Sequence, residues 1–362
     1  MKEYTDKYNE ITRKIFLDLL ENSEEQNVIM SPFSILILLG MVTESVSGNT
    51  KEELINFLKD SDDQNVVQII KNIARNVDES ESLTSANAII VNETIRDMID
   101  ARYISDIKDE FDAEVLSSDN IVEDVNAWVR EKTHGMIEEI ADDSMQDMLL
   151  ALINAISFMD DWDEFYEEDD IYPDEFTNMD DSVTEVEMMS SRESLYVENE
   201  FYTGFVKEYK SGEFSYMALL PRMEKSMALF KKAFASSNLT DLYRNAKAMK
   251  VQVEMPEFKA EFSGSLNALL ERNGINQMFT DSADFSPVTK MVPLKTDSIL
   301  HKAYIEVDRR GTKAVAVTIA DVVLGCAPPR DIEYIRLDRP FVYAIMHKKT
   351  GLPVMVGNVK ML

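Results

Sequence analysis

The sequence predicts an α+β protein that folds as a single large domain, residues 1–362. Helical spacing of apolar residues dominates the first third of the chain, and strand-like alternation dominates the rest. No Pro/Gly/Ser-rich linker and no shift in composition divides the chain, although its 362 residues exceed the usual size of one domain. Apolar residues make up 45% of the sequence, so a large common core can form.

Amphipathic helices are predicted wherever apolar residues recur every three or four positions. Leu54 and Leu58, which follow Thr50 in a helix that opens at Gly48, show this spacing. The same period appears in several other segments, so each of them can bury one face. The predicted helices are 8–20, 33–42, 50–58, 125–132, 226–234 and 263–273.

Strands are predicted where apolar and polar residues alternate, because successive side chains of a strand point to opposite faces. The predicted strands are 195–201, 205–210, 214–220, 250–255, 301–307 and 341–346. Helices followed by strands, rather than a strict strand–helix alternation, indicate an α+β fold.

The charge of the chain excludes several classes of partner. Its formal net charge is −30, so nucleic acid and anionic membrane surfaces would be repelled. A membrane-spanning helix needs about 18 apolar residues in a row, and the longest apolar run here is 35–42. We therefore expect neither a nucleic-acid partner nor a membrane partner.

The sequence offers no clear catalytic or metal site. Cys326 is the only cysteine, so no internal disulfide can form, and its Leu, Gly, Ala and Pro neighbours predict an exposed loop rather than a nucleophile's pocket. The acidic run 159–170 lacks the mid-loop glycine and closing glutamate of a calcium loop. His134, His301 and His347 lie far apart in sequence without metal-ligand spacing. We expect no enzyme activity, metal or cofactor.

The segment 306–324 combines strand-like alternation with one face of small side chains. The opposite face is larger and largely β-branched. A strand of this kind suits insertion between two existing strands over a packed core. The small face carries Thr312, Ala314, Ala316, Thr318 and Ala320.

The small-faced pattern that begins at Thr312, with Gly311 before it and the sequence DRPF at 338–341, resembles the hinge and reactive loop of the serpins, a family of serine protease inhibitors. Other motifs of the family follow in order, so the resemblance runs from about residue 8 to 360. The matched motifs are NVIMSPFSI (27–35), the helix opening at 48–58, VNAWVREKTHGMI (125–137), LINAISFMDDWDEF (152–165), MALLP (217–221), MPEF (255–258), GINQMFTDSADFS (274–286), HKA (301–303), FVY (341–343) and GNV (357–359).

The resemblance implies the serpin fold, with about nine helices around three β-sheets and a reactive-centre loop at about 309–331. It also implies suicide-substrate inhibition, in which a protease cleaves the loop, forms an acyl-enzyme and is trapped when the loop inserts into the main sheet. By the same resemblance the hinge comprises Gly311, Thr312, Ala314, Ala316 and Thr318, the shutter beneath the sheet comprises Ser31, Asn154 and His301, and Trp162 belongs to the breach where insertion begins.

The chain departs from the family pattern beside the hinge. Arg309 and Arg310 stand where the family usually has acidic residues, and Lys313 replaces the usual glutamate after the threonine. We expect these side chains to be solvent-exposed, so that they change the surface of the hinge without preventing insertion of the loop.

Counting the usual fourteen residues on from Gly311 places the scissile bond between Gly325 and Cys326. Leu324–Gly325 and Cys326–Ala327 remain alternatives, because the loop is slightly long. All three bonds put a small or aliphatic residue at the primary specificity position, which suits elastase-like and subtilisin-like serine proteases.

Other targets fit the loop less well. Arg330 lies too far along for a trypsin-like protease, and Asp321 lies too early for a caspase-like one. A papain-like target is a minor alternative. The main alternative from another class is a non-inhibitory serpin that acts as a binding or chaperone protein, although such members tend to carry bulky or charged residues on the inserting face.

Three further expectations concern heparin control, the oligomeric state and the location of the protein. Acidic residues interleave with the basic ones in 87–109, so we expect no heparin control, and we expect a monomer. The family's role favours an extracellular location, whereas the polar N-terminus shows no signal peptide and leaves a cytoplasmic location open.

Overall fold

The computed structural model describes residues 2–23, 27–59, 66–77, 80–222, 227–312 and 332–362. These residues form two compact units. Unit 1 comprises Met1–Asp18, Met30–Ser157 and Glu261–Tyr304, and unit 2 comprises Leu19–Ile29, Phe158–Ala260 and Ile305–Leu362. Helix α1 (Lys2–Asn22) and strand β11 (Phe258–Ser265) each contribute residues to both units.

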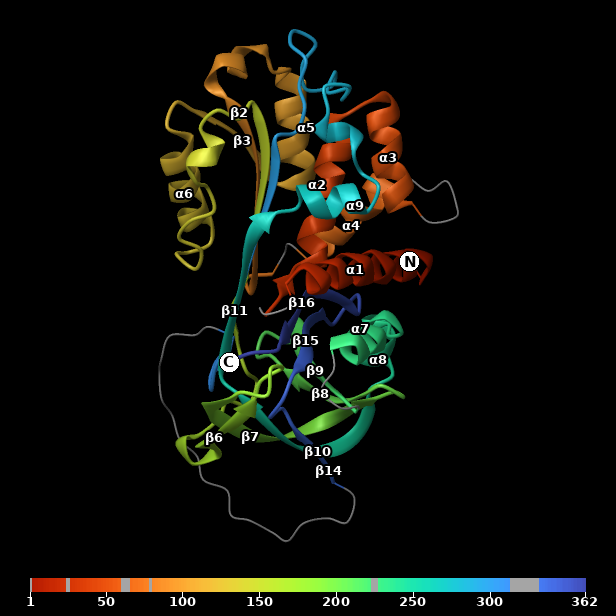
Figure 1. Cartoon of the computed structure of the whole chain (residues 1–362), viewed down its shortest axis with the longest axis vertical. Coiled ribbons are helices and arrows are strands. Elements are labelled where there is room, and N and C mark those ends of the chain that lie inside the picture. The colour runs from red at the N-terminus through yellow and green to blue at the C-terminus, as the bar shows by residue number, and fades with distance from the viewer. Residues whose placement is uncertain (1, 24–26, 60–65, 78–79, 223–226, 313–331) are drawn as a thin grey trace. The chain divides into compact units, whose positions relative to one another are not determined.

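Unit 1 contains most of the helices (Figure 1). Helix α2 is the most buried of them: Ser31 caps its first turn by accepting a hydrogen bond from the backbone N–H of Ser34, and Pro32 occupies its first position. Besides α1, the helices of this unit are α2 (Pro32–Ser45), α3 (Gly48–Leu58), α4 (Val66–Val77), α5 (Ala101–Phe111), α6 (Ile121–Lys132) and α9 (Asn267–Arg272). Its 3₁₀ turns are η1 (Glu93–Met98), η2 (Asp143–Met145) and η4 (Gln277–Phe279).

The sheet of unit 1 has the strand order β3-β2-β4-β12. Its strands are β2 (Leu83–Asn92), β3 (Ala113–Ser118), β4 (Leu150–Phe158) and β12 (Ser298–Val307). Every residue of β4 is buried, so both faces of this strand lie in the core. Strands β4 and β12 run parallel and are hydrogen-bonded to each other directly.

Unit 2 is mainly a sheet with the order β16-β15-β9-β8-β7-β10-β14, and β6 pairs with β7 (Figure 1). The 16-residue strand β7 joins what would otherwise be two smaller sheets, because different parts of it pair with β6, β10 and β8. The elements are β6 (Ile171–Thr177), β7 (Val183–Glu198), β8 (Tyr202–Glu208), β9 (Phe214–Pro221), β10 (Lys247–Pro256), β14 (Glu333–Arg336), β15 (Phe341–His347), β16 (Leu352–Val359), α7 (Met227–Ala235), α8 (Leu239–Arg244) and η3 (Glu168–Asp170).

Three short strands complete the description. Strand β1 (Ile29–Met30) pairs with β16, while β5 (Asp160–Asp161) and β13 (Gly311–Thr312) pair with each other. Across the described ranges the chain has nine α-helices, and the mixed α+β architecture predicted from the sequence is confirmed. Among those residues no helix has both the length and the apolar character needed to cross a membrane.

Most predicted elements are confirmed, with shifted ends. The helix predicted at 263–273 begins later, at Asn267, because Glu261 to Ser265 still belong to strand β11. The strand predicted at 195–201 ends at Glu198, where the chain turns into β8.

Candidate functional site

The first part of the candidate site is the seam where β4 and β12 meet. Their register runs from Ser298 opposite Ala151 to Tyr304 opposite Ser157, and no other strand lies between them. Parallel strands this close satisfy one another's backbone N–H and C=O groups, so separating them requires replacement hydrogen bonds. The seam is therefore held together by the direct backbone hydrogen bonds of the two strands.

His301 crosses this seam with its side chain. Its Nε2 accepts a hydrogen bond from the backbone N–H of Ser31 at 3.3 Å, and its Nδ1 lies 2.7 Å from Oδ1 of Asn154. Because an N–H can only donate to Nε2, the neutral ring carries its proton on Nδ1 and donates it to Asn154. All three residues are fully buried, so the three shutter positions predicted from the sequence lie together.

The hydrogen bonds of these residues continue into a ring. Asn154 donates to Oδ1 of Asn87 at 2.8 Å, and Asn87 donates to the hydroxyl of Ser85 at 3.5 Å. The hydroxyls of Ser85 and Ser34 are 3.3 Å apart, and the backbone N–H of Ser34 donates to Ser31 Oγ at 3.0 Å. We call these six residues the shutter ring: Ser31, Ser34, Ser85, Asn87, Asn154 and His301.

Sequence reasoning missed half of the shutter ring. Ser85 and Asn87 point to the same face of β2 because they are two residues apart in a strand. Two polar residues on one face of an otherwise apolar strand were the available signal. Since buried polar groups need partners, any movement that parts β4 from β12 must re-pair this ring.

Burial lowers the pKa of His301 to about 3. The imidazole is therefore neutral at physiological pH, as its acceptance of the Ser31 N–H requires. A proton on Nε2 would remove that acceptor and leave a charge in the core without a counterion in the ring.

The second part of the candidate site is the hinge, which lies in unit 2. Gly311 and Thr312 form strand β13, paired with Asp161 and Asp160 of β5, while Thr312 also pairs with Val307 at the end of β12. A Cβ on Gly311 would lie 2.2 Å from the carbonyl oxygen of Asp160, so only glycine fits here.

The side chain of Thr312 is fully buried, and its hydroxyl lies 2.7 Å from the hydroxyl of Tyr209. The turn before it is fixed by Asp308, whose Oδ1 accepts from the backbone N–H of Arg310 at 2.8 Å and of Gly311 at 3.2 Å. The first two hinge residues are thus already held as strand. The remaining hinge positions, Ala314, Ala316 and Thr318, lie outside the described residues.

Trp162, the predicted breach residue, contacts the hinge turn directly. Its indole N–H donates to the backbone carbonyl of Asp308 at 2.9 Å, and its backbone N–H donates to the carbonyl of Arg310 at 2.7 Å. The ring is fully buried and stacks on Tyr209, with centroids 4.5 Å apart and planes 11° apart. Trp162 and Thr312 therefore share Tyr209 as a neighbour.

A buried cation, Lys207, also lies in this region and was not predicted from the sequence. Lys207 Nζ lies 2.9 Å from Glu193 Oε1, 4.6 Å from the ring centroid of Tyr166 and 5.4 Å from that of Trp162. The Lys207 side chain is only 3% exposed, so its ion pair lies in the interior, where removal of either partner would leave an uncompensated charge.

The predicted cleavage positions, which are Leu324, Gly325, Cys326 and Ala327, lie outside the described residues. Among the residues that the structure does describe, no group of three or more His, Cys, Asp or Glu side chains could hold a metal ion. In the acidic run, Asp160 accepts from the backbone N–H of Ser211 at 3.3 Å, and Asp161 pairs with Lys210 at 3.4 Å.

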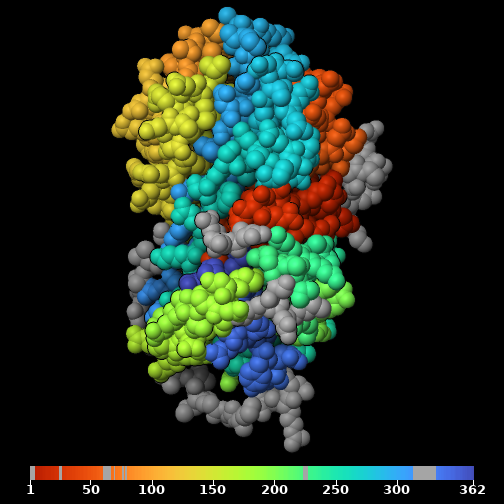
Figure 2. All heavy atoms as spheres, viewed as in Figure 1, coloured from red at the N-terminus to blue at the C-terminus, as the bar shows by residue number. Residues whose placement is uncertain are grey.

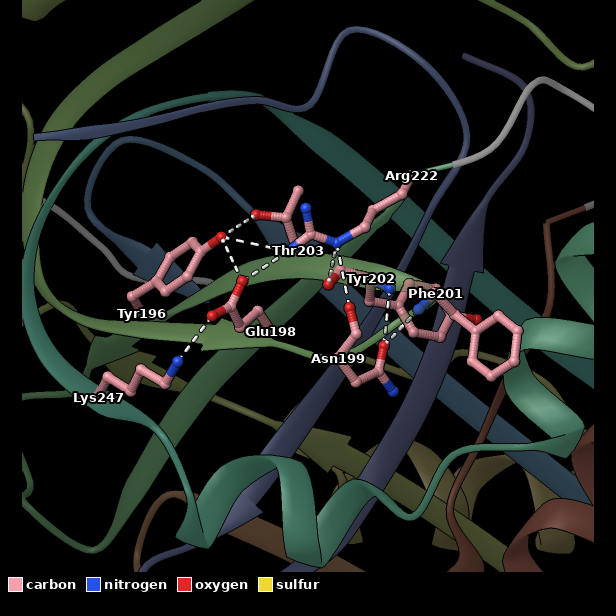
Figure 3. Close-up of polar contacts among 8 residues, drawn as sticks. All are labelled: Tyr196, Glu198, Asn199, Phe201, Tyr202, Thr203, Arg222 and Lys247. Carbon is pink, nitrogen blue, oxygen red and sulfur yellow. Dashed lines mark hydrogen bonds and ion pairs between the residues drawn. The ribbon is translucent and has the colours of Figure 1, made fainter.

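A separate polar cluster lies at the turn between β7 and β8 (Figure 3). Glu198 accepts from Arg222 at 2.7 Å and from Lys247 at 2.6 Å. Nε of Arg222 also donates to the backbone carbonyl of Asn199 at 3.1 Å, and Asn199 Oδ1 accepts from two backbone N–H groups of the turn. Glu198 forms ion pairs with both cations, so this cluster closes the turn, and we assign it no binding role.

Comparison with known proteins decides the family. The family described as serpin (serine protease inhibitor) matches residues 6–361 of this chain. This chain is a serpin. Members of the family are generally protease inhibitors rather than enzymes, and their general targets are serine proteases.

Among the relatives of this serpin, Iripin-8 from Ixodes ricinus is 27% identical, with 96% of this chain and 90% of that protein covered. The native-state crystal structure of tengpin, a thermophilic serpin, superposes with a TM-score of 0.87 at 31% identity and covers 98% of this chain and 94% of that one. A complex of thyroxine-binding globulin with thyroxine has a TM-score of 0.87 at 22% identity, with 99% and 98% covered, which shows a shared fold.

Proposed function

We propose that this serpin inhibits serine proteases as a suicide substrate. The protease serine attacks the carbonyl carbon of the residue before the cut, and the amine of the following residue leaves with a proton. The acyl-enzyme then remains on the cleaved loop. Insertion of that loop between β4 and β12 displaces and inactivates the protease before water can release it.

The observation that carries this proposal is the state of the hinge. Gly311 and Thr312 already pair as a strand with β5, and Thr312 pairs with the end of β12. Both are small and buried, so the start of an inserted strand is in place without a bulky or charged side chain. Non-inhibitory members tend instead to carry bulky or charged residues on the inserting face.

The direct pairing of β4 with β12 gives the proposal its second support. The seam holds no strand between them, so an insertion site is available. The shutter ring links the N-terminus of helix α2 to β2, β4 and β12 through hydrogen bonds that involve side chains. We infer that Ser31, Asn154 and His301 serve as the shutter and Trp162 as the breach.

For the target we propose elastase-like or subtilisin-like proteases, on the basis of the small and aliphatic residues from Leu324 to Ala327. Incubation with neutrophil elastase and, separately, with subtilisin tests this. A complex that survives denaturing electrophoresis, together with a released C-terminal peptide that begins at Cys326, supports trapping and the predicted bond. A peptide that begins at Gly325 or Ala327 supports trapping and moves the bond by one residue.

Cleavage by both proteases without any stable complex would contradict the inhibitory proposal for these targets. The likeness to thyroxine-binding globulin, solved in complex with thyroxine, then favours the second candidate, a serpin that serves as a binding protein. Thermal unfolding of the intact serpin with and without small apolar ligands would test that function, since a ligand that binds only the folded state raises the unfolding temperature.

A further inference from the structure

We propose that Glu257 is a positioning residue for the hinge: its carboxylate holds Arg309 and so fixes the place where the inserted strand begins. The inference rests on the proposed inhibitory function and adds a residue to it. It also gives a physical reason for an arginine at a position where the family usually has an acidic residue.

The contacts of Glu257 reach both the side chain and the backbone of Arg309. Nε of Arg309 donates to Glu257 Oε1 at 2.7 Å, and the backbone N–H of Arg309 donates to the same oxygen at 3.2 Å. The carbonyl of Arg309 accepts from the backbone N–H of Tyr166 at 2.9 Å. Both peptide groups of Arg309 are therefore held, two residues before Gly311.

Glu257 is itself fixed by the strands on either side of it. It is the single residue between the end of β10 at Pro256 and the start of β11 at Phe258. Its backbone N–H donates to the carbonyl of Glu187 in β7 at 3.0 Å. Because the backbone of Glu257 belongs to the sheet, its carboxylate is a rigid anchor for the hinge.

The electrostatic surroundings suit a cation at position 309. The hydrogen bond that Arg309 donates to Glu257 raises the pKa of Arg309, and the charges of Glu187 and Asp308 act in the same direction. The β6–β7 hairpin, yellow-green in Figure 2, also carries Glu175 opposite Glu185. A glutamate at 309 would face Glu257 as a like charge and would release the hinge.

Charge reversal and re-reversal test the proposal. We expect Arg309→Glu to raise the ratio of cleaved to trapped serpin about fivefold, the upper end for a half-exposed ion pair. Glu257→Arg alone should do the same, and the double variant Arg309→Glu/Glu257→Arg should restore the ratio of the unaltered protein. Arg309→Gln, which introduces no like charge, provides a milder variant in case the reversal impairs folding.

The readout separates positioning from general stability. The total rate at which protease consumes serpin, by cleavage and trapping together, reports loop recognition and should not change in any variant. The matched control is Lys259→Glu. Lys259 lies in β11, two residues after Glu257, and the change breaks its 2.8 Å ion pair with Glu306. This control should leave the ratio unchanged.

Two results would overturn the proposal. One is an unchanged ratio in Arg309→Glu and Arg309→Gln, and the other is a double variant that remains as defective as the single ones. If the unaltered serpin forms no complex at all, the proposed inhibitory function fails instead. Native-state thermal unfolding then still tests the anchor, because each single variant should lower the unfolding temperature and the double variant should recover it.

Discussion

Replacement of His301 by glutamine should remove a large part of the serpin's sensitivity to acid. Glutamine keeps one donor and one acceptor near Asn154 and the Ser31 N–H but cannot titrate in this range. Burial lowers the pKa of His301 from 6.5 to about 3. The unfolded chain therefore binds a proton between these pH values while the folded protein does not.

The sign follows from this difference in bound protons. Above pH 6.5 the ring is neutral in both states, and as the pH falls below 6.5 protonation of the unfolded chain reduces the free energy of unfolding. At pH 4.5, which lies below the unfolded pKa and above the folded one, the loss is about 2–3 kcal/mol. The loss grows until the pH approaches the folded pKa, where it levels off.

The assay is urea denaturation of both proteins at pH 7 and pH 4.5. Other titrating groups, including the buried His347, affect both proteins alike, so the difference between the two losses isolates His301. We expect the unaltered serpin to lose about 2–3 kcal/mol more than His301→Gln over this interval. Equal losses in the two proteins would refute the claim that His301 is buried and neutral in the shutter ring.

Three changes at the hinge should alter stability and inhibition together. Gly311→Ala places a methyl group 2.2 Å from the carbonyl oxygen of Asp160. We therefore expect the free energy of unfolding to fall by about 1–3 kcal/mol in urea denaturation and more cleaved product to appear on gels. Unchanged trapping would contradict this. Thr312→Val leaves the buried Tyr209 hydroxyl without its 2.7 Å partner and should cost about 1–3 kcal/mol, whereas Thr312→Ser should keep most of that stability. Trp162→Phe removes the indole N–H bond to the hinge turn and should lower the unfolding midpoint and slow trapping, and a wild-type trapping rate would exclude a breach role.

The parts of the fold that were predictable are those with one buried face. Strand β12 alternates buried and half-buried residues along most of its length, and the sequence shows that alternation. Strand β4 is buried on both faces, and its continuous apolar sequence has no period from which to recognise a strand. No strand was therefore predicted here, and Asn154 was singled out through the family motif and not through periodicity.

The candidate site divides in the same way. Thr312 was predictable because a small-residue face is visible in the sequence, and Gly311 was implied by the family resemblance. Asn87 and Glu257 were not, because their roles depend on strands distant in the chain: Asn87 reaches Asn154 across the sheet, and Glu257 reaches Arg309 from the β10–β11 junction. Pairings of this kind follow from tertiary structure and leave no local pattern.

The central claim is that the cleaved loop inserts between β4 and β12, and a crystal structure of the loop-cleaved serpin tests it most directly. The account predicts a new strand between β4 and β12 that continues from Thr312, with the present pairing of Asn154 opposite His301 broken. A cleaved protein in which β4 and β12 remain paired in their present register would contradict the account.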